Sequence, residues 1–165
     1  MIVIANDHTG LELKNEIKKF FEERGLAYKD IGTNTPERTD YPLWGWRAAK
    51  LVASGECERG VIICGTGVGI SLAANKVKGI RCVVCTDCYT AQLSRLHNNS
   101  NMLALGARVL GTGLARLITE IWLDTPFEGG RHKPRVDMLR EIEDGVFQTK
   151  FETSQTKFET SQTKA

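Results

Sequence analysis

The sequence lacks a long hydrophobic run and carries little excess charge. No apolar stretch in its 165 residues approaches the ~20 residues that a membrane-spanning helix needs. The net charge of +2 is too small to indicate a nucleic-acid-binding surface. The opening residues, MIVIANDHTG, lack the basic region and cleavage site of a signal peptide. We therefore expect a cytoplasmic protein that binds neither nucleic acid nor a membrane.

Cysteine occurs in an odd number, five, which argues against a framework of disulfides. Cys82, Cys85 and Cys88 have the two-residue gaps that are common among thiolate ligands of metals. However, Cys82 and Cys85 are three positions apart in an expected strand, so their side chains would point to opposite faces of a sheet. No fourth ligand stands at a recognisable spacing. The sequence thus predicts reduced core thiols and no metal site.

Strand-like and helix-like segments alternate along the chain. Short strands are expected at 1–5, 26–32, 60–64, 80–86 and 101–107, and helices at 11–25, 41–56, 70–77, 87–98, 113–123 and 136–147. Helices between short apolar strands imply parallel pairing with right-handed crossovers, and hence a three-layer α/β sandwich. In such sheets ligands bind at the carboxyl ends of the strands.

One domain is expected over residues 1–148. The segment KFETSQT then occurs twice in succession, at 150–156 and 157–163. One aromatic residue per seven is too few for a coiled-coil seam, which needs two apolar positions per heptad. We therefore interpret residues 149–165 as a fusion scar and not as a functional element.

Polar and reactive residues collect near the ends of several expected elements. Asp7 and His8 follow the first strand, Cys64 ends the third, and Thr66 follows it. His97 closes the helix that precedes the fifth strand. Because the fold class places ligands at the carboxyl edge of the sheet, we expect these residues to form a site there.

The position of Cys64 in VIICGTGVGISLAANK allows two interpretations. Cysteine packs well in a core, which is the simpler one. Alternatively, closely spaced glycines at a helix start let backbone N–H groups surround an anion, and the helix dipole favours a thiolate that could act as nucleophile or base. GTGVG matches neither the dinucleotide nor the P-loop pattern. A cysteine phosphatase loop would need arginine where Ile70 stands.

Basic residues gather around Pro134, a natural first-turn residue of a helix. They are Arg131, His132, Lys133 and Arg135. Cations are unfavourable at the positive end of a helix dipole, and a bound phosphate would relieve that conflict. A solvated basic loop is the alternative.

Six motifs occur in order: NDHTG, ERTDYP, IICGTGVGISLAANK, GIRCVVCTD, HNNSNMLALGARV and FEGGRHKPRV. Over about Met1 to Phe147 they resemble the type B ribose-5-phosphate isomerases, in the sugar-phosphate isomerase family that includes the galactose-6-phosphate isomerase subunits. The resemblance implies a Rossmann-like sandwich with a five-stranded parallel sheet. It also implies a homodimer, sometimes paired into tetramers, with the site shared between subunits. The implied reaction interconverts D-ribose 5-phosphate and D-ribulose 5-phosphate without metal or organic cofactor.

The resemblance further implies roles for individual residues. Cys64 matches the base that moves a proton between C2 and C1 through a cis-enediolate. His97 matches the acid that helps to open the furanose ring, assisted by Asp7 and Thr66. The residues implied in substrate binding are Asp7, His8, Tyr41, the loop Gly65, Thr66, Gly67, Val68 and Gly69, Asn98, Arg108, Arg131 and Arg135. Among these, His8 and the arginines match phosphate ligands, and Tyr41 matches a residue that lines the sugar pocket.

Three alternatives stay open from the sequence alone. The first is an isomerase of the same family that acts on allose 6-phosphate or galactose 6-phosphate. The second is a non-catalytic, flavodoxin-like anion-binding module, which would bind a ligand without turnover. The third is a thiol hydrolase, which would form a covalent adduct at Cys64, whereas isomerisation would leave none.

Overall fold

The structure is a computed structural model that describes residues 1–147. The chain divides into two compact units, Met1–Glu128 and a second unit that begins at Gly129. Each unit is described by itself below. The single domain expected over residues 1–148 stays a prediction, and the repeated tail lies outside the described residues.

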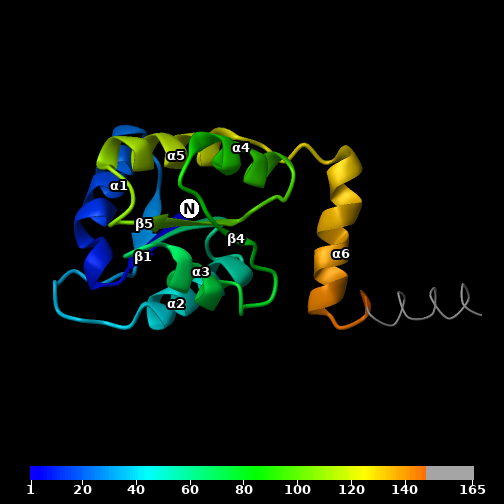
Figure 1. Cartoon of the computed structure of the whole chain (residues 1–165), viewed down its shortest axis with the longest axis horizontal. Helices are drawn as coiled ribbons and strands as arrows, with labels where there is room; N and C mark the ends of the chain where they lie inside the picture. Colours follow the sequence, from blue (N-terminus) through cyan, green and yellow to red (C-terminus); the bar gives the residue numbers. More distant parts are fainter. Residues whose placement is uncertain (148–165) are drawn as a thin grey trace, which may run out of the picture. The chain divides into compact units, whose positions relative to one another are not determined.

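The first unit contains a five-stranded parallel sheet between two layers of helices (Figure 1). The strands are β1 (Ile2–Asn6), β2 (Tyr28–Asp30), β3 (Arg59–Cys64), β4 (Cys82–Val84) and β5 (Met102–Gly106), in the order β2-β1-β3-β5-β4. The helices are α1 (Leu11–Glu23), α2 (Tyr41–Ala53), α3 (Val68–Ala74), α4 (Cys88–Leu96) and α5 (Thr112–Asp124), with a 3₁₀ turn, η1 (His8–Gly10). The expected α/β class and three-layer architecture are confirmed.

The central strands are long and apolar, and the edge strands are short. β1, β3 and β5 form the middle of the sheet, where every residue of β1 and β5 is buried. β2 lies at one edge, in agreement with its polar sequence. β4 lies at the other edge and has three residues, fewer than the expected 80–86. As an edge strand, β4 pairs with β5 alone, and this pairing covers only Cys82–Val84.

Each face of the sheet has its own hydrophobic core. Alternate residues of β3 serve the two cores: Val61 and Ile63 pack toward α1, α4 and α5, while Ile62 and Cys64 pack toward α2 and α3. Cys82 and Cys85 also belong to opposite cores, which confirms the expectation from their spacing. A fully buried side chain of this size contributes about 1.5–3 kcal/mol.

The second unit begins with a short 3₁₀ turn, η2 (Gly130–His132), and continues into α6 (Lys133–Glu143). Pro134 lies in the first turn of α6, as its sequence position predicted. Three apolar side chains of α6 are about half exposed, namely Met138, Leu139 and Ile142. Across the described residues 1–147, no helix is long and apolar enough to cross a membrane.

Candidate active site

The carboxyl ends of β1, β3 and β5 meet at one edge of the sheet. The Asp7 N–H donates to the Ile63 carbonyl at 3.1 Å, and the Arg108 N–H donates to the Gly65 carbonyl at 2.9 Å. A Cβ placed on Gly65 would lie 3.6 Å from Arg108 Cδ and 3.7 Å from Thr9 Oγ1. The turns after these three strands therefore bring a carboxylate, a hydroxyl and a guanidinium side chain around the start of the glycine loop.

Cys64 is the last residue of β3, and its thiol faces the glycine loop. The Gly67 N–H donates to Cys64 Sγ at 3.2 Å. Gly67 has φ +79°, and a Cβ there would lie 3.1 Å from the Leu105 carbonyl carbon, so only glycine fits this turn without strain. The turn holds a backbone N–H donor against the Cys64 sulfur. Cys64 therefore has a chemical environment that simple core packing does not require.

Asp7 is held in one orientation by the turn that follows it. Its Oδ1 accepts hydrogen bonds from the Thr9 N–H at 2.9 Å and from Thr9 Oγ1 at 2.6 Å. This is the turn that aspartate commonly makes with the backbone two residues further on. Thr9 was absent from the residues singled out by sequence, although the spacing in NDHTG carries this signal. Thr66 makes a similar bond, since its Oγ1 accepts the Val68 N–H at 3.3 Å.

Residues around the start of α2 lie beside the glycine loop. The Tyr41 ring lies against Gly69, where an added Cβ would be 2.7 Å from Tyr41 Cε2 and Cζ. His8 Nδ1 lies 3.2 Å from both the backbone N and the carbonyl O of Thr39, so either neutral tautomer has a partner. Trp44 Nε1 donates to Thr39 Oγ1 at 2.9 Å. Tyr41 and His8 thus lie at the same edge as Cys64, and Thr39, which holds His8, is a second residue that the sequence reasoning missed.

His97 and Asn98 do not join this group within the first unit. They follow α4, which returns from the carboxyl edge, and they precede β5. The neighbouring Asn101 carbonyl accepts from the N–H of Gly60, at the start of β3, at 3.0 Å. Five residues of β5, about 16 Å at ~3.3 Å each, separate this turn from the carboxyl edge. Within one copy of the chain His97 therefore lies away from Cys64, because the helix before it runs antiparallel to the strands, and its role at the site stays a prediction.

His97 and Asn98 each have identified neighbours in the first unit. His97 Nε2 lies 3.9 Å from Glu128 Oε2, at the end of the first unit. Asn98 lines a pocket of about 280 Å³ that also contains Val84, Tyr89 and Leu93. This pocket lies between the edge strand β4 and α4.

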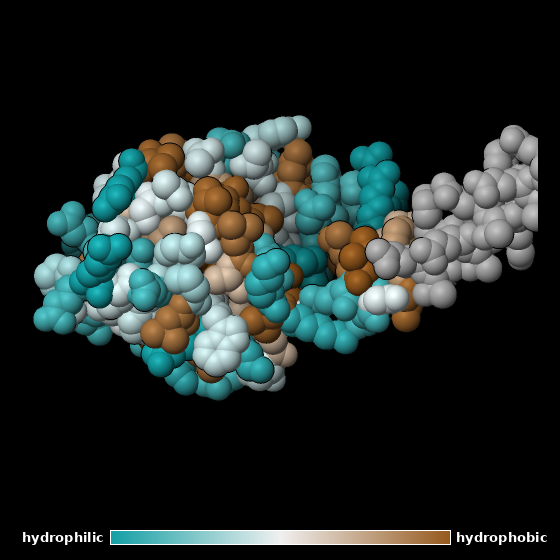
Figure 2. All heavy atoms as spheres, turned by 60° about the horizontal axis from the view of Figure 1, so that its bottom comes forward, coloured by the Kyte–Doolittle hydropathy of each residue, from teal (hydrophilic) through white to brown (hydrophobic). Residues whose placement is uncertain are grey.

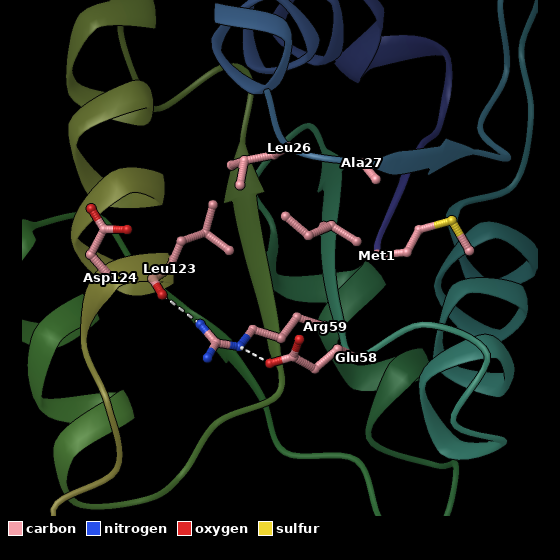
Figure 3. Close-up of a pocket in the computed structure, with 8 residues that line it drawn as sticks. Met1, Leu26, Ala27, Glu58, Arg59, Leu123 and Asp124 are labelled. Carbon is pink, nitrogen blue, oxygen red and sulfur yellow. Dashed lines mark hydrogen bonds and ion pairs between the residues drawn. The ribbon is translucent and has the colours of Figure 1, made fainter. Parts of the chain in front are cut away.

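A second cavity, of about 240 Å³, lies at the amino edge of the sheet (Figure 3). Arg59 donates to the Leu123 carbonyl at 2.6 Å, and its Nε lies 3.3 Å from Glu58 Oε1. The lining residues are Met1, Ile2, Leu26, Ala27, Glu58, Arg59, Leu123 and Asp124. They include no cysteine, serine or histidine.

Burial holds other cysteines of the first unit as thiols. It raises the pKa of Cys85 to about 11 and that of Cys82 still further. Burial also raises the pKa of Cys57. In the second unit, Arg131 Nε donates to His132 Nε2 at 3.2 Å, and Arg135 lies in the first turn of α6. The phosphate-binding role of these two arginines stays a prediction.

A parallel α/β sheet with a hydrogen-bonded thiol, an oriented carboxylate and a guanidinium at its carboxyl edge is typical of α/β enzymes that act on small anionic molecules. The family model described as Ribose/Galactose Isomerase matches residues 2–139. The chain belongs to this family of isomerases, and the resemblance drawn from the six motifs is confirmed.

Individual relatives cover nearly the whole described chain. Ribose-5-phosphate isomerase B of Escherichia coli (strain K12) is 52% identical over 142 residues, which are 86% of this chain and 95% of the relative. D-erythrulose-4-phosphate isomerase of Pectobacterium atrosepticum is 41% identical over 143 residues, 86% of this chain and 94% of the relative. The solved structure of ribose-5-phosphate isomerase B from Clostridium thermocellum superposes with a TM-score of 0.86 at 53% identity, covering 87% of this chain and 97% of that one. The Rossmann-like sandwich is thereby confirmed.

Proposed function

We propose that this protein interconverts D-ribose 5-phosphate and D-ribulose 5-phosphate. The observation that carries the proposal is the hydrogen bond from the Gly67 N–H to Cys64 Sγ, at the edge of the sheet where Asp7 and Arg108 also lie. Relatives named for this activity are 52% and 53% identical to the chain and support the choice of substrate.

In the proposed mechanism, Cys64 is the base. As a thiolate it removes the proton from C2 of the open-chain aldose, the carbonyl oxygen at C1 becomes an enediolate oxygen, and the proton returns to C1. Removal of a proton next to a carbonyl needs such a base together with donors for the developing oxyanion. Backbone N–H groups of the loop from Gly65 to Gly69 supply the donors. Thr66 and the oriented Asp7 assist His97 in opening the furanose ring.

The proposed site is shared between two copies of the chain. His97, the ring-opening acid, and Asn98, which binds the substrate, lie at the opposite edge of the sheet from Cys64, so the second copy must supply them. The face that carries α2 and α3 shows exposed hydrophobic residues beside the glycine loop (Figure 2). They are Leu43, Trp46, Val68 and Leu72. A homodimer that covers this face is the proposed assembly, and a tetramer of two dimers is the alternative.

The phosphate is proposed to bind arginine and histidine side chains remote from the reacting carbons. His8 and Arg108 lie at the carboxyl edge of the first unit, and Arg131 and Arg135 belong to the second unit. Arginine forks fit phosphate oxygens, and binding energy gained there can position C1 and C2. The proposed reaction needs neither a metal nor an organic cofactor.

A second candidate substrate is a four-carbon sugar phosphate, because a relative at 41% identity is named for D-erythrulose 4-phosphate. The six-carbon substrates allose 6-phosphate and galactose 6-phosphate are further candidates of the same reaction class. A comparison of kcat/KM across the four-, five- and six-carbon phosphates decides between them, and the proposal requires the five-carbon substrate to be best.

The test of the base is ketose formation from D-ribose 5-phosphate in chelator-containing buffer. The variant Cys64→Ala is compared with Cys88→Ala, a partly exposed cysteine outside the proposed site. We expect the Cys64 variant to lose turnover while its thermal unfolding stays cooperative, and the Cys88 variant to keep it. Turnover in a folded Cys64→Ala protein would contradict the thiol as base. Ligand binding without turnover in the wild type would favour the anion-binding module, and a covalent adduct at Cys64 would favour the hydrolase.

Co-expression of two inactive variants tests the shared site. A dimer of one Cys64→Ala chain and one His97→Ala chain contains one site with both residues intact and one with neither. Random pairing gives heterodimers in half of the assemblies, so the mixture should recover about a quarter of wild-type activity. Sites confined to one chain would recover none.

A further inference from the structure

The turn from His97 to Asn101 has an unusual backbone conformation. Asn99 has φ +47°, the only positive φ of a non-glycine residue in the described part of the chain. Residues other than glycine rarely adopt this left-handed region, although asparagine does so more readily than most. The turn therefore depends on its surroundings to keep this shape.

Two arginines donate to the backbone of this turn. Arg81 Nε donates to the carbonyl oxygens of Asn98 and Asn99 at 3.1 and 3.0 Å, and Arg81 Nη2 donates to that of Asn99 at 2.9 Å. Arg95 Nη1 donates to Asn99 Oδ1 at 3.2 Å and also to the Ser100 carbonyl. The two guanidinium groups thus bind three consecutive residues, beginning one position after His97.

Arg95 is far more buried than a surface ion-pairing residue, with 5% of its surface exposed. Its guanidinium lies over the Trp122 ring, 5.7 Å from the ring centroid, and its Nε donates to the Thr125 carbonyl at 3.2 Å. The Trp122 Nε1 donates to Ser100 Oγ at 2.8 Å, so the ring that covers Arg95 also binds the turn. Burial lowers the pKa of Arg95 to about 10, so the group stays charged at neutral pH.

We propose that Arg95 is a positioning residue, which fixes the His97–Asn101 turn so that His97 reaches the substrate held by the second copy. This inference rests on the proposed function, which gives His97 its ring-opening role. The position of Arg95 fits the task, since it lies on the last turn of α4 and donates to the residues that follow the helix. Loss of its hydrogen bonds would let Asn99 leave the left-handed region and would rotate the peptides next to His97.

Ring opening can be measured apart from proton transfer. D-ribose 5-phosphate is mostly a closed furanose and must open before C2 is accessible to the base. D-ribulose 5-phosphate has no hydroxyl free to close a furanose ring, so exchange of its C1 hydrogen with deuterium in D₂O needs the base but not the ring-opening acid. A defect in positioning His97 should therefore lower ketose formation much more than C1 exchange.

The experiment compares Arg95→Lys with His97→Gln and a matched control, Arg59→Lys. Arg59 lies 5.8 Å from the centroid of the same Trp122 ring, but its guanidinium donates to the Leu123 carbonyl (Figure 3). We expect Arg95→Lys to lower ketose formation by about tenfold or more, as sub-ångström misplacement of a catalytic group does. C1 exchange should fall by less than about threefold. His97→Gln should show the same split, and Arg59→Lys neither effect.

Arg81→Ala is a second variant in case Arg95→Lys fails to fold, because Arg81 is only partly buried and donates to the same turn. It should show the split as well. The comparison is valid if His97→Gln lowers ketose formation much more than C1 exchange. In that case, an equal decrease of ketose formation and C1 exchange in folded Arg95→Lys and Arg81→Ala proteins would overturn the positioning role. If His97→Gln shows no split, the ring-opening role in the proposed function fails instead. In that case the imidazole NMR signals of His97 decide the inference: they should shift in Arg95→Lys and not in Arg59→Lys, and unchanged signals would overturn it.

Discussion

The contact between β5 and the glycine loop allows a sharp test of the site. Gly106, the last residue of β5, pairs in register with Cys64 and lies directly beneath Thr66. A Cβ added at Gly106 would be 2.8 Å from both the carbonyl carbon and the carbonyl oxygen of Thr66. Gly106 is not among the glycines with positive φ, so alanine can adopt its backbone conformation. The substitution Gly106→Ala therefore acts through this steric contact alone.

The size of the effect follows from that distance. Ordinary contacts of a Cβ begin near 3.4 Å, so the loop must move by about 0.6 Å to accept the methyl group. Insertion of a methyl group into a packed contact costs about 1–3 kcal/mol of stability. The same movement changes the distance between the Gly67 N–H and Cys64 Sγ, now 3.2 Å. Because a catalytic group misplaced by about 1 Å can lose a hundredfold in rate, we expect kcat/KM to fall by about tenfold to a hundredfold.

The assay is kcat/KM for D-ribose 5-phosphate together with a urea unfolding curve. Gly113→Ala, in the first turn of α5, is the matched control, because a Cβ there meets no atom within 4 Å. Alanine at that helical position should stabilise the protein by about 0.5–1 kcal/mol and leave activity unchanged. If folded Gly106→Ala had a kcat/KM within twofold of that of Gly113→Ala, the inference that β5 positions the loop around the Cys64 thiol would be wrong.

Two further predictions concern buried groups of the first unit. Lys14 is fully buried and donates to Asp30 and to the Thr33 carbonyl, so Lys14→Met should lower the free energy of unfolding by about 3 kcal/mol. Lys19 belongs to an exposed ion pair, so Lys19→Met should change that free energy by less than about 0.5 kcal/mol. Chemical denaturation measures both, and effects of similar size would contradict the prediction. Burial raises the pKa of Cys85 from the ordinary 9.0 to about 11. Between pH 9 and pH 11 the unfolded chain therefore loses the thiol proton while the folded chain keeps it. The free energy of unfolding should fall as the pH rises through this range, by up to about 3 kcal/mol. Urea midpoints from pH 7 to 11 should therefore fall less steeply for Cys85→Ala than for the wild type, and parallel curves would refute the assignment.

The fold could be predicted because its signals are local. Apart from the polar β2, each strand is a short apolar run, and each helix has a periodic apolar face, a proline in its first turn or a glycine near its end, so the order of elements follows directly from the sequence. Strand lengths were harder to predict: residues 80–86, IRCVVCT, are mostly apolar, yet β4 spans only Cys82–Val84. An edge strand has one neighbour, and the extent of that pairing is not encoded in the run itself. The contact between Gly69 and the Tyr41 ring is also tertiary, since it joins two motifs 28 positions apart.

The placement of His97 was predictable in principle, and the reason concerns chain direction. In a parallel sheet the residues after a strand lie at its carboxyl edge, as Asp7 and Arg108 do, and those before a strand lie at its amino edge. His97 precedes β5, so its sequence position already separates it from Cys64 by the length of that strand. A reaction that uses both side chains at one substrate therefore requires two copies of the chain, whatever the details of their contact. The recovery of about a quarter of the activity on mixing Cys64→Ala with His97→Ala would be the direct consequence of that strand direction.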